Sequence, residues 1–423
     1  MADPVSSVAY AIEAAVGALD GDLGSLFPTM ACVIGVIALV AAGYHGLIGR
    51  FPGGGGGPEG LAAAFGEGWA FLPLGALLVD FTLTIAVSSA AAGSAVIAYL
   101  PGLAGWRVPL AAALVLAVAA GTLLGHASRV VFATATLAFV AAAGVVLALG
   151  SGEPAAATAP ALAGDASLLP VLLALPLGMA LATGVEAPSN AIAQLGQLDA
   201  AGRRRFGRLT LWIMLAIVGT LTLGLAALAV RLGVSAPQAD STLLADVAER
   251  ATGGGGAFAA FQGTSAALLL AAAASSFLAG SGLLEALARH GGNGDGLLPR
   301  RFQSTNRWYV PPWGVAALAA VAAVLVAATG GHEQELVQFY AVAVFASFLG
   351  ALVAAAVLSL RDGHRGAAFV AGLGAACVAL VLALNLRRLD PIGSLAVSAA
   401  VSTYLWRAWV SRGRPGGVAE IAR

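Results

Sequence analysis

Long apolar runs separated by short polar segments are the feature that most limits how this chain can fold. Of its 423 residues, 59% are hydrophobic and only 10% are charged, whereas a soluble domain carries about 25% charged residues. The charged residues cluster between apolar runs that are long enough to cross a bilayer, for which about 20 residues suffice. We therefore predict a polytopic protein of the cell membrane.

The apolar runs are predicted to be helices, so the fold class is all-α. In the hydrocarbon layer every backbone polar group needs a partner within the protein, and the runs lack the alternation of β-barrel strands. The transporter domain is expected to cover residues 1–410, with 411–423 as a short cytoplasmic tail. The twelve predicted spans are residues 2–18, 27–48, 68–98, 107–124, 130–150, 168–195, 209–230, 258–288, 312–330, 335–360, 366–386 and 391–410.

All 21 basic residues are arginines, and their placement predicts the orientation of the chain. Sixteen of the 21 fall on one side of the predicted spans and five on the other, and the side richer in arginine is normally cytoplasmic. Both termini are then cytoplasmic, and no nucleic-acid partner is needed to explain the arginine-rich loops. Because lysine is absent, the glycine run Gly53 to Gly57 cannot belong to a phosphate-binding P-loop.

Asp80 is the clearest functional candidate inside a span. It follows Trp69 by 11 residues, which places it about 16 Å into a hydrocarbon core of roughly 30 Å. Thr84 and Ser88 share its helical face at i+4 and i+8, where they fit ion ligands and interhelical hydrogen bonds equally well. All arginines fall in loops or near span ends, so a transported cation or a proton is predicted to balance the aspartate.

The first and sixth spans carry polar groups beside helix-breaking residues. In the first span, Asp3 and Tyr10 are two helical turns apart and Glu13 follows one turn later. In the sixth, Thr183 and Glu186 lie in the segment Thr-Gly-Val-Glu-Ala-Pro, after two prolines and a glycine. Transporters bind substrates at such interrupted helices, because irregular backbone is tolerated at membrane depth only where it lines a cavity or is buried in protein.

The separation of these two spans predicts an internal repeat. Spans one and six are five apart, as expected if spans one to five and six to ten are inverted repeats with the transport site at their interface. The repeats would cover about residues 1–150 and 168–360, followed by two extra helices at 366–410.

Five stretches of the sequence resemble, in their order and spacing, a branch of the amino acid, polyamine and organocation (APC) superfamily. This resemblance implies a LeuT-type fold. Within this superfamily, the chain is most similar to the KimA-type potassium importers, which are thought to couple potassium uptake to protons. The cytosolic domain of longer importers has no counterpart in this sequence. The five stretches are Asp3-Pro-Val-Ser-Ser-Val-Ala-Tyr10, Phe51-Pro-Gly-Gly-Gly55, Gly75-Ala-Leu-Leu-Val-Asp-Phe-Thr-Leu-Thr84, Ala182-Thr-Gly-Val-Glu-Ala187 and Phe339-Tyr-Ala-Val-Ala-Val-Phe345.

The resemblance implies a set of ion ligands from four helices. A tyrosine that the family carries beside its third-helix aspartate is Phe81 here, so one hydroxyl ligand is missing. Glu13 and Glu186 are candidates for carrying the coupled proton. The resemblance also allows a homodimer, and no cofactor is expected beyond transported potassium and protons. By position, the implied ligands are Asp3, Tyr10, Asp80, Thr84, Ser88, Thr183 and Tyr340.

An amino acid permease with the same fold is the main alternative. Such permeases bind the substrate carboxylate on exposed amides at a glycine-rich break in the first helix. Here Ser6 and Ser7 stand at that place, and no glycine precedes Gly17. Carboxylate, hydroxyl and phenol oxygens suit a hard cation better, so potassium is the favoured substrate.

An intramembrane aspartyl protease is a remote alternative from a different class. Gly292-Asn-Gly-Asp295 has the G-x-G-D form of these enzymes, which need two facing carboxylates that share a proton. The motif falls in a hydrophilic loop, where a glycine-rich turn explains it. We therefore expect the protein not to be an enzyme.

Overall fold

In the computed structural model, all regular secondary structure of the described residues is helical, as predicted. The described residues are 2–126, 129–157, 159–160, 168–238, 240–290, 296–387, 390–418 and 421, without the side chains of 2, 129, 194, 340–343, 390 and 391. The longer helices are α3 (Leu23–Arg50), α5 (Phe71–Tyr99), α6 (Arg107–Leu123), α7 (Arg129–Gly150), α10 (Ala200–Leu232), α12 (Gly255–Arg289), α13 (Pro312–Ala328), α14 (Glu333–Arg361), α15 (Arg365–Asn385) and α16 (Asp390–Ser411). The shorter helices are α1 (Ala2–Ser6), α2 (Val8–Ala18), α4 (Gly56–Phe65), α8 (Leu168–Gly178), α9 (Ala187–Ala191) and α11 (Leu243–Thr252).

Helical structure lies at every predicted span. In the described part of the chain, nine helical segments are long and apolar enough to cross a membrane by length and composition. The shorter apolar helices α2 and α13 fall at two further predicted spans, and α16 falls at the last one. The chain is thus an all-α, multi-pass membrane protein.

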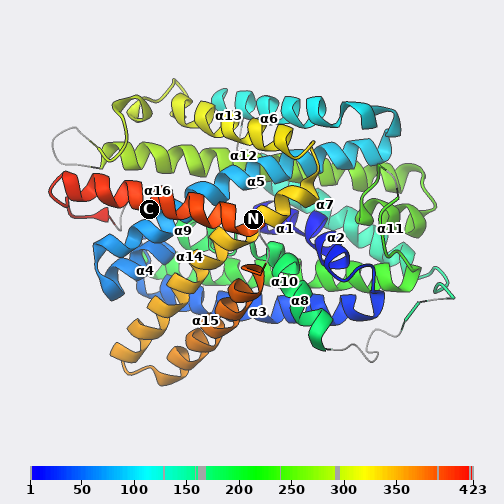
Figure 1. Cartoon of the computed structure of the whole chain (residues 1–423), viewed down its shortest axis with the longest axis horizontal. Coiled ribbons are helices and arrows are strands. Elements are labelled where there is room, and N and C mark those ends of the chain that lie inside the picture. The colour runs from blue at the N-terminus through cyan, green and yellow to red at the C-terminus, as the bar shows by residue number, and fades with distance from the viewer. Residues whose placement is uncertain are drawn as a thin grey trace.

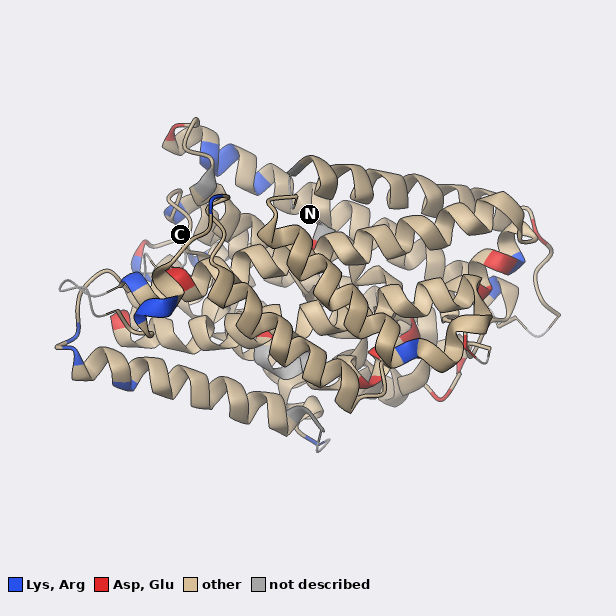
Figure 2. Cartoon of the chain, turned by 90° about the horizontal axis from the view of Figure 1, so that it is seen from above, with Lys and Arg blue, Asp and Glu red and all other residues tan. Residues whose placement is uncertain are grey.

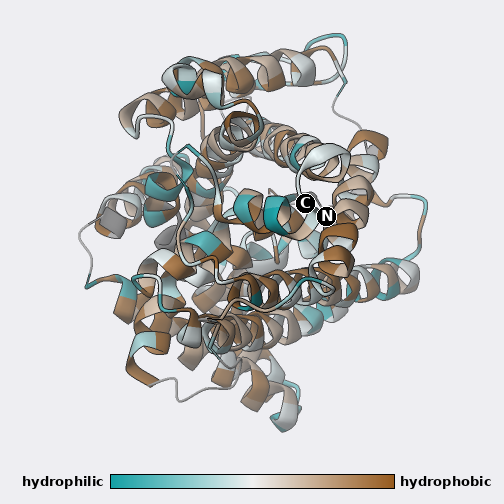
Figure 3. Ribbon diagram, turned by 90° about the vertical axis from the view of Figure 1, so that its right-hand side faces the viewer, coloured by the Kyte–Doolittle hydropathy of each residue, from teal (hydrophilic) through white to brown (hydrophobic). Residues whose placement is uncertain are grey.

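The helices surround a core in which α5 is central. It packs against α12, α14, α16, α6 and α13, and α1 lies near the middle of the molecule (Figure 1), where it packs mainly against α12. Charged residues gather at the two ends of the bundle, and most arginines lie at one of them (Figure 2). Hydrophobic residues cover much of the helical surface (Figure 3), and side chains such as Leu116 and Leu137 are exposed there, as expected of a surface that faces lipid.

The predicted interruptions of spans one and six are present. The first span divides at Ser7 into α1 and α2, and the Ser7 hydroxyl donates back to the Pro4 carbonyl oxygen at 2.7 Å. The sixth span runs through α8 and a 3-10 turn at Met179–Ala182, and then leaves helical geometry. Thr183 is extended at φ −56° and ψ 139°, and Gly184 has φ +71°, a conformation that side chains disfavour.

A short helix, α11, lies between α10 and α12. Its N-cap is Thr242, whose hydroxyl accepts a hydrogen bond from the Ala245 amide at 3.2 Å. The neighbouring Ser241 hydroxyl donates to the Asp246 carboxylate at 2.6 Å. The helix also buries Leu243 and most of its first two turns, because it packs against α7, α10 and α12 rather than lying on the surface.

Thr242→Ala is expected to lower the free energy of unfolding by about 1 kcal/mol, because the first turn of α11 loses its side-chain cap. Thermal unfolding of the purified protein in detergent would measure the change. The matched control is Thr264→Ala in α12, whose hydroxyl bonds only to carbonyl oxygens of its own helix. Equal unfolding temperatures for the two variants would contradict the assignment of the cap.

Candidate functional site

The two helix breaks touch each other. The Ser7 hydroxyl donates to the Leu181 carbonyl oxygen at 3.2 Å, which joins the first break to the sixth span. A methyl group on Gly184 would lie 2.6 Å from Asp3 Oδ2 and 2.9 Å from Pro4 Cδ. The left-handed backbone at Gly184 therefore permits a close approach between α1 and the sixth-span break that a larger residue would prevent.

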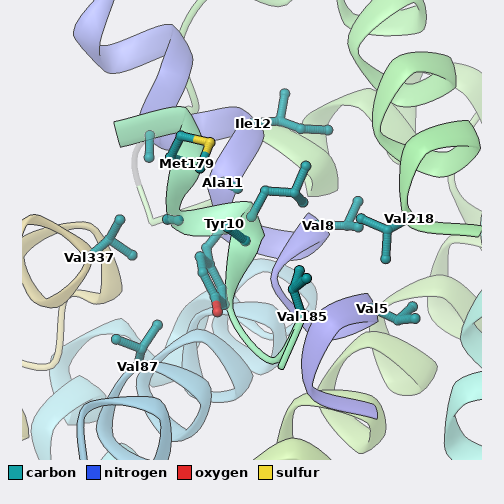
Figure 4. Packing of buried hydrophobic residues seen from close by; sticks show 14 of the residues in the cluster. Val5, Val8, Tyr10, Ala11, Ile12, Val87, Met179, Val185, Val218 and Val337 are labelled. Carbon is teal, nitrogen blue, oxygen red and sulfur yellow. The ribbon is translucent and has the colours of Figure 1, made fainter. Parts of the chain in front are cut away.

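Four of the predicted ligands gather at this junction. The Tyr10 phenol lies close to the Thr183 hydroxyl and within electrostatic reach of the Asp3 and Asp80 carboxylates. Figure 4 shows the Tyr10 ring extending from α2 past the sixth-span break toward α5, where Val87 lies. Tyr10, Asp80 and Thr183 are all buried. Residues from α1, α2, α5 and the break thus place carboxylate, phenol and hydroxyl oxygens together inside the bundle.

The column predicted on α5 is buried in full. Asp80, Thr84 and Ser88 are 5%, 1% and 0% exposed. Among the described residues, Ser88 Oγ has no hydrogen-bond partner, and neither has Asp3 Oδ1 in α1. A buried polar oxygen without a partner costs about 1 to 3 kcal/mol, so oxygens of this kind suit a site whose bonding is completed by a ligand.

Two further positions of the predicted ligand set are Tyr340 on α14 and Phe81 on α5, where the expected hydroxyl group is missing. Tyr340 is in α14, and its side chain falls outside the described part of the structure. Phe81, where the related importers carry a tyrosine, packs against Gly280 of α12, since a methyl group on that glycine would lie 3.2 Å from Phe81 Cβ. The Phe81 ring therefore contributes to contacts between α5 and α12.

Glu186 lies next to the cluster of Asp3, Tyr10, Asp80 and Thr183, and it is held there by residues that the sequence did not predict. Its Oε2 accepts a hydrogen bond from the Tyr44 hydroxyl of α3 at 3.0 Å and a weaker one from the Ser347 hydroxyl of α14 at 3.5 Å. Asp3 is within electrostatic reach of Glu186, and Asp80 is within reach of Tyr44. Tyr44 lies near the end of its predicted span, where a tyrosine is usually interfacial; no sequence signal connected it to Glu186.

Glu13 lies apart from Glu186. Its Oε2 accepts a hydrogen bond from the Leu243 amide at 2.7 Å, so it binds the N-terminus of α11. It also lines a cavity of about 940 Å³ together with Leu177 of α8 and Gln334 of α14. Gln334 also donates to the Tyr10 carbonyl oxygen at 3.4 Å. The lining residues from Glu13 to Ala18 place this cavity beside the C-terminal half of α2.

The G-x-G-D motif at residues 292–295 lies outside the described residues. The sequence profile and the relative that match this chain are those of transporters rather than enzymes. The chain is accordingly a transporter, and the catalytic alternative is set aside.

Comparisons with known proteins show the family of this chain. A sequence profile described as amino acid permease matches residues 5–404. The potassium transporter KimA of Bacillus subtilis (strain 168) is 30% identical over 361 residues, which cover 82% of this chain and 58% of that protein. The chain therefore spans less than two thirds of the length of this relative.

A crystal structure of the Eremococcus coleocola manganese transporter, in complex with an aromatic bis-isothiourea substituted compound, has a TM-score of 0.49 and 15% sequence identity. The match covers 99% of this chain and 94% of that one. The sequence profile extends over nearly the whole chain, including both helix breaks. The chain belongs to the amino acid permease family.

Proposed function

We propose that this permease takes up potassium by alternating access and couples the uptake to protons. The observation that carries the proposal is the meeting of the buried residues Tyr10, Asp80 and Thr183 with the partly buried Asp3, from three helices and a helix break. Carboxylate, phenol and hydroxyl oxygens are the ligands that hard cations prefer. The similarity to a potassium transporter supports the same substrate.

In the proposed mechanism, Asp80 balances the charge of a dehydrated potassium ion, and the neighbouring oxygens replace its water shell. Thr84, Ser88 and Tyr340 complete the ligand set that the related importers suggest. Glu186 is the better candidate for the coupled proton, because it lies beside the cluster, whereas Glu13 binds the amide of Leu243. Rocking of the interrupted helices against the rest of the bundle would then expose the ion to alternate sides.

The proposal includes the topology predicted from the sequence. Ten of twelve membrane-spanning segments would form two inverted repeats, which meet where the breaks of the first and sixth spans touch. The arginines at one end of the bundle would place that end in the cytoplasm of a cell whose membrane the protein spans. The first helix, α1, lies near the middle of the molecule rather than at that end (Figure 1).

Uptake of an amino acid is the second candidate, favoured by the profile of the family. The charges of the site oppose it. The carboxylates Asp3, Asp80 and Glu186 lie around the same break. They would attract the ammonium group of an amino acid, but its carboxylate would lie only a few bonds away from them, and like charges in a low-dielectric site repel strongly. Potassium meets attraction from the same groups.

Uptake into proteoliposomes decides between the two candidates. Labelled rubidium, as a potassium tracer, is expected to accumulate when the outside is acidic, and unlabelled potassium should compete with it. Each of a panel of labelled amino acids should remain at the level of liposomes without protein. Accumulation of an amino acid without rubidium uptake would replace the potassium proposal with the amino acid one.

A further inference from the structure

Tyr44 contacts two parts of the protein, the Glu186 carboxylate and the N-terminal turn of α4. On one side, its hydroxyl donates to Glu186 Oε2 at 3.0 Å. On the other side, a methyl group on Gly57 would lie 3.5 Å from the Tyr44 hydroxyl oxygen and 3.3 Å from Ala351 Cβ. The hydroxyl is therefore enclosed between the carboxylate and the first turn of α4.

The segment before α4 also packs closely on α9, the helix that begins directly after Glu186. A methyl group on Gly56 would overlap Ser189 Oγ of α9, and one on Gly54 would lie 2.7 Å from Ala193 Cβ in the 3-10 turn that follows α9. Gly54 and Gly56 both have positive φ. The glycine run of residues 53–57 thus brings the start of α4 against α9 with no room for a side chain at Gly56, and places Gly57 in contact with Tyr44.

We propose that Tyr44 is a positioning residue for Glu186, and that it links this carboxylate to the packing of α4 against α9. The inference rests on the proposed role of Glu186 as the carrier of the coupled proton. When Glu186 is charged, the Tyr44 hydroxyl is fixed as its donor; when Glu186 binds a proton, that bond weakens. The hydrogen bond made by the hydroxyl that the first turn of α4 contacts therefore changes in strength with the protonation of the carboxylate.

Distance and packing favour Tyr44 over Ser347 in this role. The Ser347 hydroxyl is 3.5 Å from the same carboxylate oxygen, at the limit of a hydrogen bond. The Tyr44 ring is fully buried and packs edge-on against Phe348, with ring centroids 6.0 Å apart. A rigid ring that is held on both sides keeps its hydroxyl at one place, as a positioning residue requires.

Other ionisable groups surround this pair. Asp3 of α1 acts on Glu186, and Asp80 of α5 acts on Tyr44. Glu59 lies on α4, two residues after Gly57. Because Tyr44 is the one donor at normal hydrogen-bond distance among these contacts, its loss should favour the protonated form of Glu186.

The test is the pH dependence of rubidium uptake by the full chain in proteoliposomes. Tyr44→Phe removes the hydroxyl and keeps the ring, and it should move the pH of half-maximal uptake by about one unit to the alkaline side, since a hydrogen bond to a charged group is worth about one pH unit or more. Ser347→Ala should cause a smaller displacement in the same direction. The matched control, Tyr404→Phe, alters an exposed tyrosine on α16 and should leave the profile unchanged.

A Tyr44→Phe profile that coincides with the wild type would overturn the inference, even if the maximal rate falls. If this variant does not fold, Gly57→Ala carries the test, because its methyl group would crowd Ala351 Cβ at 3.3 Å and thereby shift the first turn of α4, which contacts the Tyr44 hydroxyl, by a few tenths of an ångström. An unchanged pH profile for Gly57→Ala would then overturn the inference. Failure of the wild type to transport rubidium would instead refute the proposed function. In that case, the pH profiles of amino acid uptake by the wild type and by Tyr44→Phe would test the role of Tyr44 separately.

Discussion

Asp80→Asn is expected to reduce rubidium uptake at least about 100-fold while the protein still folds. Asparagine has nearly the same shape but no charge, so a dehydrated cation at the cluster loses its counter-charge. Removing one partner of a buried charge pair costs about 3 kcal/mol or more, which corresponds to a factor of about 100 in binding. Uptake into proteoliposomes gives the activity, and size-exclusion chromatography checks the fold.

The matched control is Asp362→Asn. Asp362 accepts a hydrogen bond from Arg50 Nη2 at 2.9 Å in an exposed ion pair, outside the cluster. Exposed pairs contribute little to stability, so this variant should transport at the wild-type rate. If both variants lost activity equally, or if Asp80→Asn kept its rubidium flux, Asp80 would not be the ion ligand.

Gly184→Ala is expected to lower the free energy of unfolding by about 2 to 5 kcal/mol and to abolish transport. A left-handed backbone costs a residue with a side chain about 1 to 2 kcal/mol, and overpacking adds about 1 to 3 kcal/mol. The new methyl group would meet the Pro4 ring at 2.9 Å, and a proline ring cannot rotate away. Thermal unfolding in detergent and rubidium uptake would measure both effects.

Gly263→Ala in α12 provides the control for this substitution. Nothing lies within 4 Å of a methyl group at that position, and alanine is favoured over glycine inside a helix by about 1 kcal/mol. The control should therefore be as stable as the wild type or slightly more stable. Wild-type stability and uptake in Gly184→Ala would show that the two breaks need not touch.

The sequence was enough to locate the central carboxylate and the two helix breaks. Asp80 is conspicuous because a charge inside an apolar run is costly, and the helical period then selects Thr84 and Ser88. The sixth-span break follows from local chemistry, since glycine at position 184 and proline at position 188 both disfavour a continuous helix. These features depend on neighbours along the chain, which sequence patterns record.

Contacts between distant helices could not be predicted in the same way. Tyr44 and Ser347 reach Glu186 only because α3 and α14 pack beside the break, and single hydroxyl groups in membrane spans are too common to indicate this. Glu13 follows Tyr10 by one helical turn, yet it faces the Leu243 amide of α11. A shared helical face therefore did not imply a shared site.

Binding of potassium to the purified protein tests the central claim most directly, because it does not depend on transport. Isothermal titration calorimetry of the wild type in choline buffer is expected to show saturable potassium binding, and Asp80→Asn should show none. Asp362→Asn should bind as the wild type does. Saturable potassium binding by Asp80→Asn with wild-type affinity would contradict the assignment of the ion site to the cluster around Asp80.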